Sequence, residues 1–248
     1  MSEACCTLPP VQAEYTSKGS FETVAGLKTY KTGPADATTA VILIYDVFGI
    51  TPQIQQGADM LAASGKHPFQ VLIPDFLKGE YAQGSWFGPN AGEEGKKAIG
   101  KYFGPDGVGN PGVVTGLLKK VVEEIKGAGT VTKFGAVGYC WGAKIVSINL
   151  TEGTAFSVAA EVHPSMMTPE DGSKIVKPII VLASKDEDAE IVKAFGANLK
   201  VPNVVDFYNE SPHGWMTTRA DLKDEKMAAN FAKGYQAVSD FFHEHLSL

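Results

Sequence analysis

Short apolar runs alternate with longer amphipathic stretches along most of this chain. Six runs have the length and composition of buried strands: 41–45, 69–73, 133–139, 156–162, 178–184 and 204–208. Apolar residues recur at helical spacing in four intervening or flanking stretches: 51–64, 113–126, 142–150 and 220–245. Strands that alternate with helices predict a single α/β domain whose mainly parallel sheet is covered by helices on both faces.

The segment 78–112 does not follow this alternation of strands and helices. It is rich in glycine, it contains Trp86 and Phe87, and it has a helical pattern over 91–102. An excursion of this kind can serve as a lid or pocket wall, which would place Trp86 against a substrate. A surface loop with no role in a site explains the same composition, and the sequence leaves both interpretations open.

Composition limits the classes of partner. The chain has 248 residues, of which 44% are hydrophobic and 20% charged, as expected for a folded domain. Its formal net charge of −6 argues against nucleic acid as the main partner, since phosphate binding requires a basic surface. The apolar runs are too short to cross a membrane, and the first residues do not resemble a signal peptide. We therefore expect no membrane partner and a cytoplasmic location.

The cysteine and histidine pattern predicts neither a disulfide framework nor a metal site. There are three cysteines, Cys5, Cys6 and Cys140, and an odd count with two adjacent residues does not suggest paired disulfides. Three cysteines are also too few for a Cys-based zinc site. His243 and His245 are two residues apart in a predicted helix, so their side chains point in different directions.

The strongest motif is Gly138-Tyr139-Cys140-Trp141-Gly142, which lies between a predicted strand and a predicted helix. It has the pattern of a nucleophile elbow with cysteine in place of serine. In such a turn the flanking glycines permit close approach of the backbone, and the N–H of the residue after the nucleophile points toward a developing oxyanion. The alternative is a buried structural cysteine in a tight turn.

A nucleophile in an elbow needs a base and an acid that follow it in the order acid, then histidine. Asp186 follows the strand 178–184 and is the predicted acid, with Asp188 as the second choice. His213 follows the last strand and is the predicted base. His163 also ends a strand, but it precedes the acid, so we interpret it as a pocket-wall or structural residue.

With these motifs in place, the sequence resembles the dienelactone hydrolases, most closely their eukaryotic, fungal-type cytosolic branch. The resemblance extends from about residue 30 to the C-terminal helix. It is carried by five segments in order: Tyr45–Gly49, Ile73–Phe76, Gly138–Gly142, Ser184–Asp186 and His213–Trp215. It implies an α/β-hydrolase fold, carboxymethylenebutenolidase-like activity, no cofactor, and a triad of Cys140, His213 and Asp186.

The resemblance also implies roles for residues around the triad. Asp46 occupies the position at which bacterial members usually carry a glutamate close to the sulfur. Val47 and Trp141 would supply the two oxyanion-hole N–H groups. Arg219, the only arginine in the chain, is a candidate for binding a substrate anion, although a solvated residue at the start of a helix is an equal alternative. Trp215 beside the base is expected in the substrate pocket.

These observations predict a hydrolase that cleaves a lactone or a small activated ester through a thioester with Cys140. Its partner would be that small molecule, and the chain would be a monomer or a homodimer. Two alternatives stay open. The first is a peroxide-reactive thiol protein, in which Cys5 or Cys6 would have to reach Cys140. The second is a non-catalytic binding protein on a hydrolase fold.

Overall fold

A central eight-stranded sheet organises the protein in the computed structural model, which describes residues 10–65, 67–88 and 90–246. Cys5 and Cys6 lie outside the described residues. In chain order the strands are β1 (Ser20–Val24), β2 (Leu27–Thr32), β3 (Thr39–Ile44), β4 (Gln70–Pro74), β5 (Lys133–Tyr139), β6 (Val158–Val162), β7 (Ile179–Ser184) and β8 (Asn203–Tyr208). The spatial order is β1-β2-β4-β3-β5-β6-β7-β8. The β1–β2 and β2–β4 pairings are antiparallel and all others are parallel, so the predicted mainly parallel α/β sheet is confirmed.

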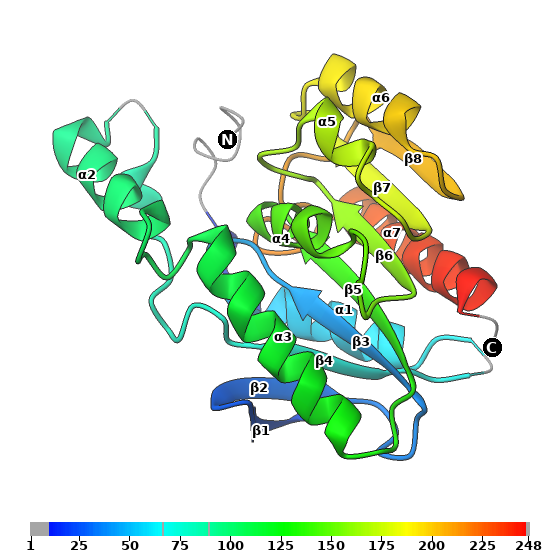
Figure 1. The fold of residues 1–248 in the computed structure, drawn as a ribbon. Coiled ribbons are helices and arrows are strands. Elements are labelled where there is room, and N and C mark those ends of the chain that lie inside the picture. The colour runs from blue at the N-terminus through cyan, green and yellow to red at the C-terminus, as the bar shows by residue number, and fades with distance from the viewer. Residues whose placement is uncertain (1–9, 66, 89, 247–248) are drawn as a thin grey trace.

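Helices cover both faces of this sheet (Figure 1). Helices α3 and α4 pack together on one face, and α1 and α7 pack together on the other. Helices α5 and α6 contact each other beside β8, whereas α2 projects away from the sheet. The bounds are α1 (Pro52–Ala62), the short 3₁₀ helix η2 (Gly84–Trp86), α2 (Gly92–Phe103), α3 (Pro111–Gly127), α4 (Trp141–Asn149), α5 (Pro169–Gly172), α6 (Ala189–Asn198) and α7 (Glu225–His245).

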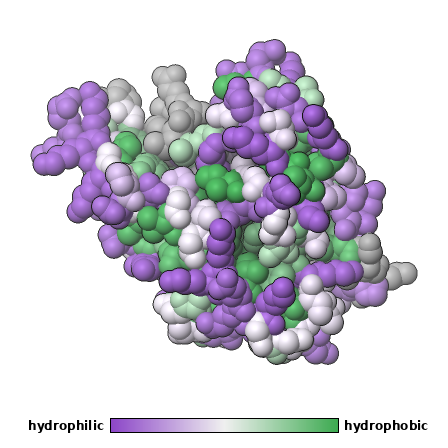
Figure 2. All heavy atoms as spheres, in the orientation of Figure 1, coloured by the Kyte–Doolittle hydropathy of each residue, from purple (hydrophilic) through white to green (hydrophobic). Residues whose placement is uncertain are grey.

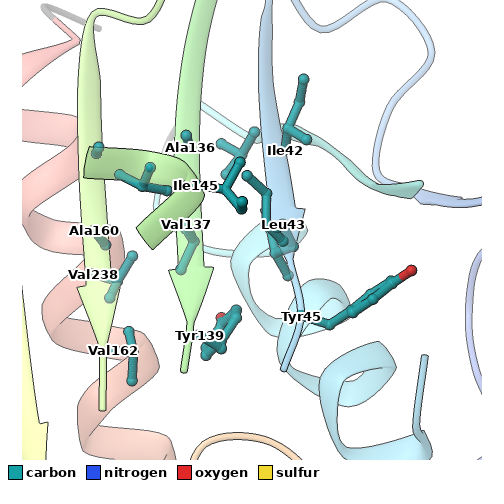
Figure 3. Close-up of a cluster of buried hydrophobic side chains, with 14 of the residues drawn as sticks. Ile42, Leu43, Tyr45, Ala136, Val137, Tyr139, Ile145, Ala160, Val162 and Val238 are labelled. Atoms are coloured by element: carbon teal, nitrogen blue, oxygen red, sulfur yellow. The ribbon is translucent and has the colours of Figure 1, made fainter. Parts of the chain in front are cut away.

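The core lies on both sides of the central strands β3, β5 and β6 (Figure 3). Ile145 of α4 covers one face of these strands, and Val238 of α7 covers the other. Because both faces are covered, successive residues such as Val41 and Ile42 are all buried, and the strands read as continuous apolar runs. This arrangement fixes the carboxyl ends of β3, β5, β6 and β7 side by side at one edge of the sheet.

The structure differs from the predicted elements in three places. The β1–β2 hairpin was not expected, because its two-residue turn is Ala25-Gly26, with φ of 50° and 76°, rather than an Asn-Gly or Asp-Gly pair. Helix α6, capped by the Asp188 carboxylate, was also missed. The last helix begins at Glu225 instead of residue 220, because residues 214–219 form turns beside the site described below.

The face in Figure 2 is mostly hydrophilic, with apolar atoms in separated patches. Large exposed apolar side chains are few and dispersed: Phe21, Val113, Ile148, Val176, Ile191 and Val204. Within residues 10–65, 67–88 and 90–246, no helix has the length and hydrophobicity needed to traverse a bilayer.

One buried carboxylic acid side chain lies between β6 and α4. Glu161 is fully buried, and its Oε1 accepts a hydrogen bond of 2.6 Å from the Ser147 hydroxyl. Burial, only partly offset by that bond, raises the pKa of Glu161 from 4.5 to about 8. The carboxyl is therefore protonated in the folded protein near neutral pH.

We expect the stability of the protein to fall as pH rises from about 4.5 to about 8, because over this window the unfolded chain ionises Glu161 and the folded chain does not. Replacing Glu161 by Gln removes this contribution. Relative to the E161Q variant, the wild type should lose up to ~1.4 kcal/mol of unfolding free energy per pH unit in that window. Urea unfolding at pH 5, 6.5 and 8 measures the difference. Exposed Glu190→Gln is the control, and parallel curves for wild type and E161Q would contradict the prediction.

Candidate active site

The predicted elbow is present between β5 and α4. Cys140 has φ 54° and ψ −114°, in the left-handed region that L residues seldom adopt. A Cβ added at Gly142 would lie 2.0 Å from the Ile44 carbonyl oxygen, and one at Gly138 would lie 2.3 Å from the Gly142 oxygen. Both glycines are thus required by close backbone contacts. The turn holds Cys140 at the carboxyl edge of the sheet, in a position that is 2% exposed.

Two backbone N–H groups flank this cysteine. Trp141 is the first residue of α4, and Val47 follows the end of the neighbouring strand β3. Neither N–H donates to another group within the part of the chain that the structure describes. The Val47 carbonyl, in contrast, accepts from the Ala82 N–H at 2.9 Å, which fixes its peptide. Both N–H groups lie just beyond the carboxyl ends of the paired strands β3 and β5.

The base predicted from sequence has a buried acid partner. His213 Nδ1 lies 2.6 Å from Glu187 Oε1, and the two side chains are 1% and 4% exposed. The same carboxylate accepts hydrogen bonds from the backbone N–H and the hydroxyl of Ser184, at the end of β7. Glu187 is therefore held in place on one side by its own loop and contacts the imidazole on the other.

This geometry differs from the predicted pairing of Asp186 with the His213 imidazole. Asp186 does not contact the imidazole of His213; its Oδ2 accepts the backbone N–H of His213 at 2.8 Å. Asp188, the second choice, caps α6. The sequence places three consecutive carboxylates after β7, and the turn made by Ser184, whose hydroxyl accepts the Asp186 N–H at 3.2 Å, decides which one faces His213.

Asp46 is held by the loop that follows His213. Its Oδ2 accepts hydrogen bonds from the hydroxyls of Thr217, at 2.6 Å, and Thr218, and its Oδ1 accepts the Phe48 N–H at 2.9 Å. The side chain is 3% exposed. The shorter acidic residue therefore lies at the predicted edge of the sheet, fixed by two threonines that the sequence did not single out.

A second imidazole lies in the same cluster. The His163 ring is 4.9 Å from the His213 ring, and its Nε2 is 3.4 Å from the Thr217 hydroxyl. Burial, followed by the charges of His213 and Arg219, lowers the pKa of His163 well below 6.5. The only sequence signal for this contact is that His163 ends the strand next to β5.

The two remaining residues of the C-terminal motif have different surroundings. Arg219 is 5% exposed, its Nη1 donates to the His213 carbonyl at 3.2 Å, and its guanidinium lies 5.7 Å from the centre of the Phe48 ring. It is thus a buried neighbour of the site and not a solvated helix residue. Trp215 is fully buried and stacks on Tyr208 at 4.2 Å. Its indole also packs against Gly234 of α7, so the structure places Trp215 in the core.

The 78–112 segment surrounds a cavity of about 740 Å³. Trp86 lines this cavity and meets Tyr102 edge to face at 5.4 Å. Burial and then the negative charge of Asp46 raise the pKa of Tyr102. The Trp141 indole N–H donates to the Gly109 carbonyl at 2.9 Å, so the segment is also tied to the elbow.

No group of three His, Cys, Asp or Glu side chains with the geometry of a metal site occurs among the described residues. The expectation that the site works without a metal or cofactor remains a prediction, based on the groups assembled around Cys140 and His213.

Comparison with known proteins identifies the family. The profile of the dienelactone hydrolase family matches residues 27–246. The chain belongs to the dienelactone hydrolase family. An uncharacterised AIM2 family protein of Schizosaccharomyces pombe is 35% identical over 242 residues, covering 95% of each chain. The mouse carboxymethylenebutenolidase homolog is 24% identical over 215 residues, covering 82% of this chain and 81% of the mouse protein.

Solved structures agree on the fold of this dienelactone hydrolase family member. A crystal structure of dienelactone hydrolase from Anabaena variabilis superposes with a TM-score of 0.63 at 12% identity, covering 93% of this chain and 98% of the other. At that identity the likeness shows the α/β-hydrolase architecture alone.

The elbow glycines should be sensitive to substitution. We expect Gly142→Ala to lower the free energy of unfolding by at least ~2 kcal/mol, because the added methyl group meets the Ile44 carbonyl oxygen. Gly116→Ala in α3 is the matched control: its Cβ would meet no atom within 4 Å, and it should stabilise the helix slightly. Urea unfolding of both variants measures the effect, and a neutral G142A would mean that the elbow is not packed as described.

Proposed function

We propose that this protein is a cofactor-independent hydrolase that cleaves a lactone or a small activated ester through Cys140, His213 and Glu187. The observation that carries the proposal is the buried Glu187–His213 pair at the sheet edge where the strained elbow presents Cys140. A base oriented by an acid, beside a nucleophile in an elbow, is the arrangement needed for acyl transfer.

In the first half of the reaction His213 accepts the thiol proton of Cys140. Glu187 holds the imidazole in the required tautomer and stabilises the imidazolium that forms. The sulfur bonds to the substrate carbonyl carbon, and the N–H groups of Val47 and Trp141 stabilise the resulting oxyanion. When the carbon–oxygen bond breaks, the leaving oxygen takes the proton from His213 and a thioester remains on Cys140.

In the second half His213 removes a proton from a water molecule that attacks the thioester carbonyl. The tetrahedral intermediate uses the same two N–H groups, and its collapse breaks the carbon–sulfur bond. Cys140 recovers the proton from His213, and the carboxylic acid product leaves. A reducing compartment, as proposed for a cytoplasmic protein, would keep the nucleophile as a thiol.

The substrate class follows from the chemistry of sulfur. A thiolate leaves more readily than an amide nitrogen, so the tetrahedral intermediate on an amide would revert, whereas strained lactones and activated esters go forward. The cavity lined by Trp86 and Tyr102 offers an aromatic wall within the segment 78–112. The family name and the mouse carboxymethylenebutenolidase homolog support the same class.

Substitution at position 140 tests the nucleophile. Cys140→Ala should abolish turnover of a lactone and of an activated aryl ester, because no atom remains to form the acyl-enzyme. Cys140→Ser should retain measurable activity, since the elbow and both N–H donors are unchanged. Steady-state rates, with intact-mass detection of the thioester in wild type, provide the measurement. Full activity in C140A would exclude the proposed mechanism and would point to a different hydrolytic site.

The two carboxylates beside His213 should have different effects. We expect Glu187→Gln to lower kcat by about 100-fold or more, because the amide cannot stabilise the imidazolium or enforce its tautomer. Asp186→Asn keeps an oxygen that can accept the His213 backbone N–H, and should lower kcat by less than about tenfold. The reverse order of the two effects in folded variants would assign the acid to Asp186.

A further inference from the structure

His163 is fixed against the backbone of the proposed nucleophile. The β5–β6 register pairs Tyr139 with Val162, and the Cys140 N–H donates to the Val162 carbonyl at 3.1 Å. Two residues after His163, the Ser165 N–H donates back to the Cys140 carbonyl at 3.0 Å. The short segment that carries His163 is therefore hydrogen-bonded to Cys140 on both sides.

The imidazole of His163 bridges the two acidic parts of the site. It is fully buried, and its ring meets that of His213 at 4.9 Å and 65°, near edge to face. On its other side, Nε2 lies 3.4 Å from Thr217 Oγ1. His213 is hydrogen-bonded to Glu187, and Thr217 is hydrogen-bonded to Asp46. His163 therefore lies between the two groups that hold these carboxylates.

The hydrogen bonds determine its tautomer. The Thr217 hydroxyl uses its proton on Asp46 Oδ2, 2.6 Å away, so its oxygen can only accept from His163. Nε2 of His163 therefore carries the proton. Burial, reinforced by the nearby charges of His213 and Arg219 and opposed by an interaction with the backbone of His163 itself, lowers the pKa of His163 and keeps the ring neutral. Its Nδ1 has no hydrogen-bond partner among the described residues.

Two features of His163 are unfavourable for folding. Its φ of 36° lies in the left-handed region, and its unpartnered Nδ1 is a buried acceptor. A side chain chosen for stability alone would avoid both. Their coincidence beside the proposed nucleophile and base indicates a role in the chemistry of the site.

We propose that His163 is a positioning residue for His213: its neutral ring fixes the plane of the His213 imidazole and stabilises the imidazolium formed during the reaction. Glu187 contacts the His213 imidazole at Nδ1, and the ring of His163 packs against the same imidazole. A ring packed there restricts rotation of the His213 imidazole, and a neutral aromatic ring attracts a cation beside it. The inference rests on the proposed function, because it assigns His213 the role of base.

The charged and titratable groups around the two rings come from several elements. The loop after β7 contributes the carboxylates of Glu187 and Asp186, and the carboxylate of Asp46 follows the end of β3. The loop after β8 contributes the guanidinium of Arg219, and the elbow contributes the Cys140 thiol and the Tyr139 phenol. Substitution of His163 leaves all of these in place, so a change in the titration of His213 reports the missing ring.

The test is a nitrogen-15 NMR titration of histidine-labelled protein, combined with pH–rate profiles of ester hydrolysis. In wild type, His163 should appear as the neutral tautomer protonated at Nε2 at pH 7. In His163→Asn, a residue that tolerates the left-handed backbone, the pKa of His213 should fall by about half a pH unit. The acid limb of kcat/KM should move with it, and kcat should drop at least about tenfold with KM within about threefold.

His163→Phe keeps an aromatic ring and should restore the His213 titration and most of kcat. His243→Asn is the matched control, because His243 also contacts an aromatic ring, Phe69 at 4.6 Å, before the start of β4 at the opposite edge of the sheet. It should change neither measurement. A purely structural role of His163 would reduce the folded fraction without moving the acid limb.

Either of two results would overturn the proposal: a charged or Nδ1-protonated His163 in wild type at pH 7, or an unchanged His213 titration in folded H163N. If H163N does not fold, a folded H163F that fails to reproduce the wild-type titration would overturn it equally. Absence of Cys140-dependent turnover in wild type would instead reject the proposed function, while the NMR titration would still measure the ring contact.

Discussion

The buried hydrogen bond between Glu187 and His213 joins two loops that are separated in sequence by a helix and a strand. Such a pair is costly to bury unless its geometry is well satisfied, because both groups lose their contact with water. Here the backbone and hydroxyl of Ser184 also donate to the carboxylate, and Asp186 fixes the backbone of His213. The loops after β7 and β8 are therefore locked together at the edge of the sheet that carries the site.

The edge of the sheet that carries the site also carries unfavourable backbone conformations. Cys140, His163 and Met166 all have positive φ values, and they lie within two neighbouring connections of the sheet. Each such residue costs about 1–3 kcal/mol, which the packed layers of β3, β5 and β6 with α4 and α7 can support. Strain concentrated at one edge, with regular packing elsewhere, is the distribution expected when a rigid scaffold presents a reactive group.

Asp46 shows how the same kind of site accommodates a shorter acidic residue. The side chain is anchored by the hydroxyls of Thr217 and Thr218, which follow His213 in the same loop. That loop thus carries His213, the two threonines that hold Asp46, and Arg219, which donates to the His213 carbonyl. A change in one of these residues should alter the others, since they share a few turns of backbone.

The sequence by itself determined the architecture, the elbow and the place of His213 after the last strand. Buried parallel strands appear in the sequence as apolar runs. The two glycines around Cys140 are needed because the backbone segments of a strand–helix turn approach each other closely, so this motif can also be recognised in the sequence. The β1–β2 hairpin was missed because its turn lacks the usual residues. The core packing of Trp215 was not foreseen, because a motif gives neighbours in sequence and not the direction of a side chain. Only the tertiary structure showed that Glu187, and not Asp186, contacts the His213 imidazole, and that His163 and the two threonines belong to the same cluster of side chains. These contacts depend on how loops from separate strands meet at one edge of the sheet. There, a shift of one position along the chain changes which side chain faces the site.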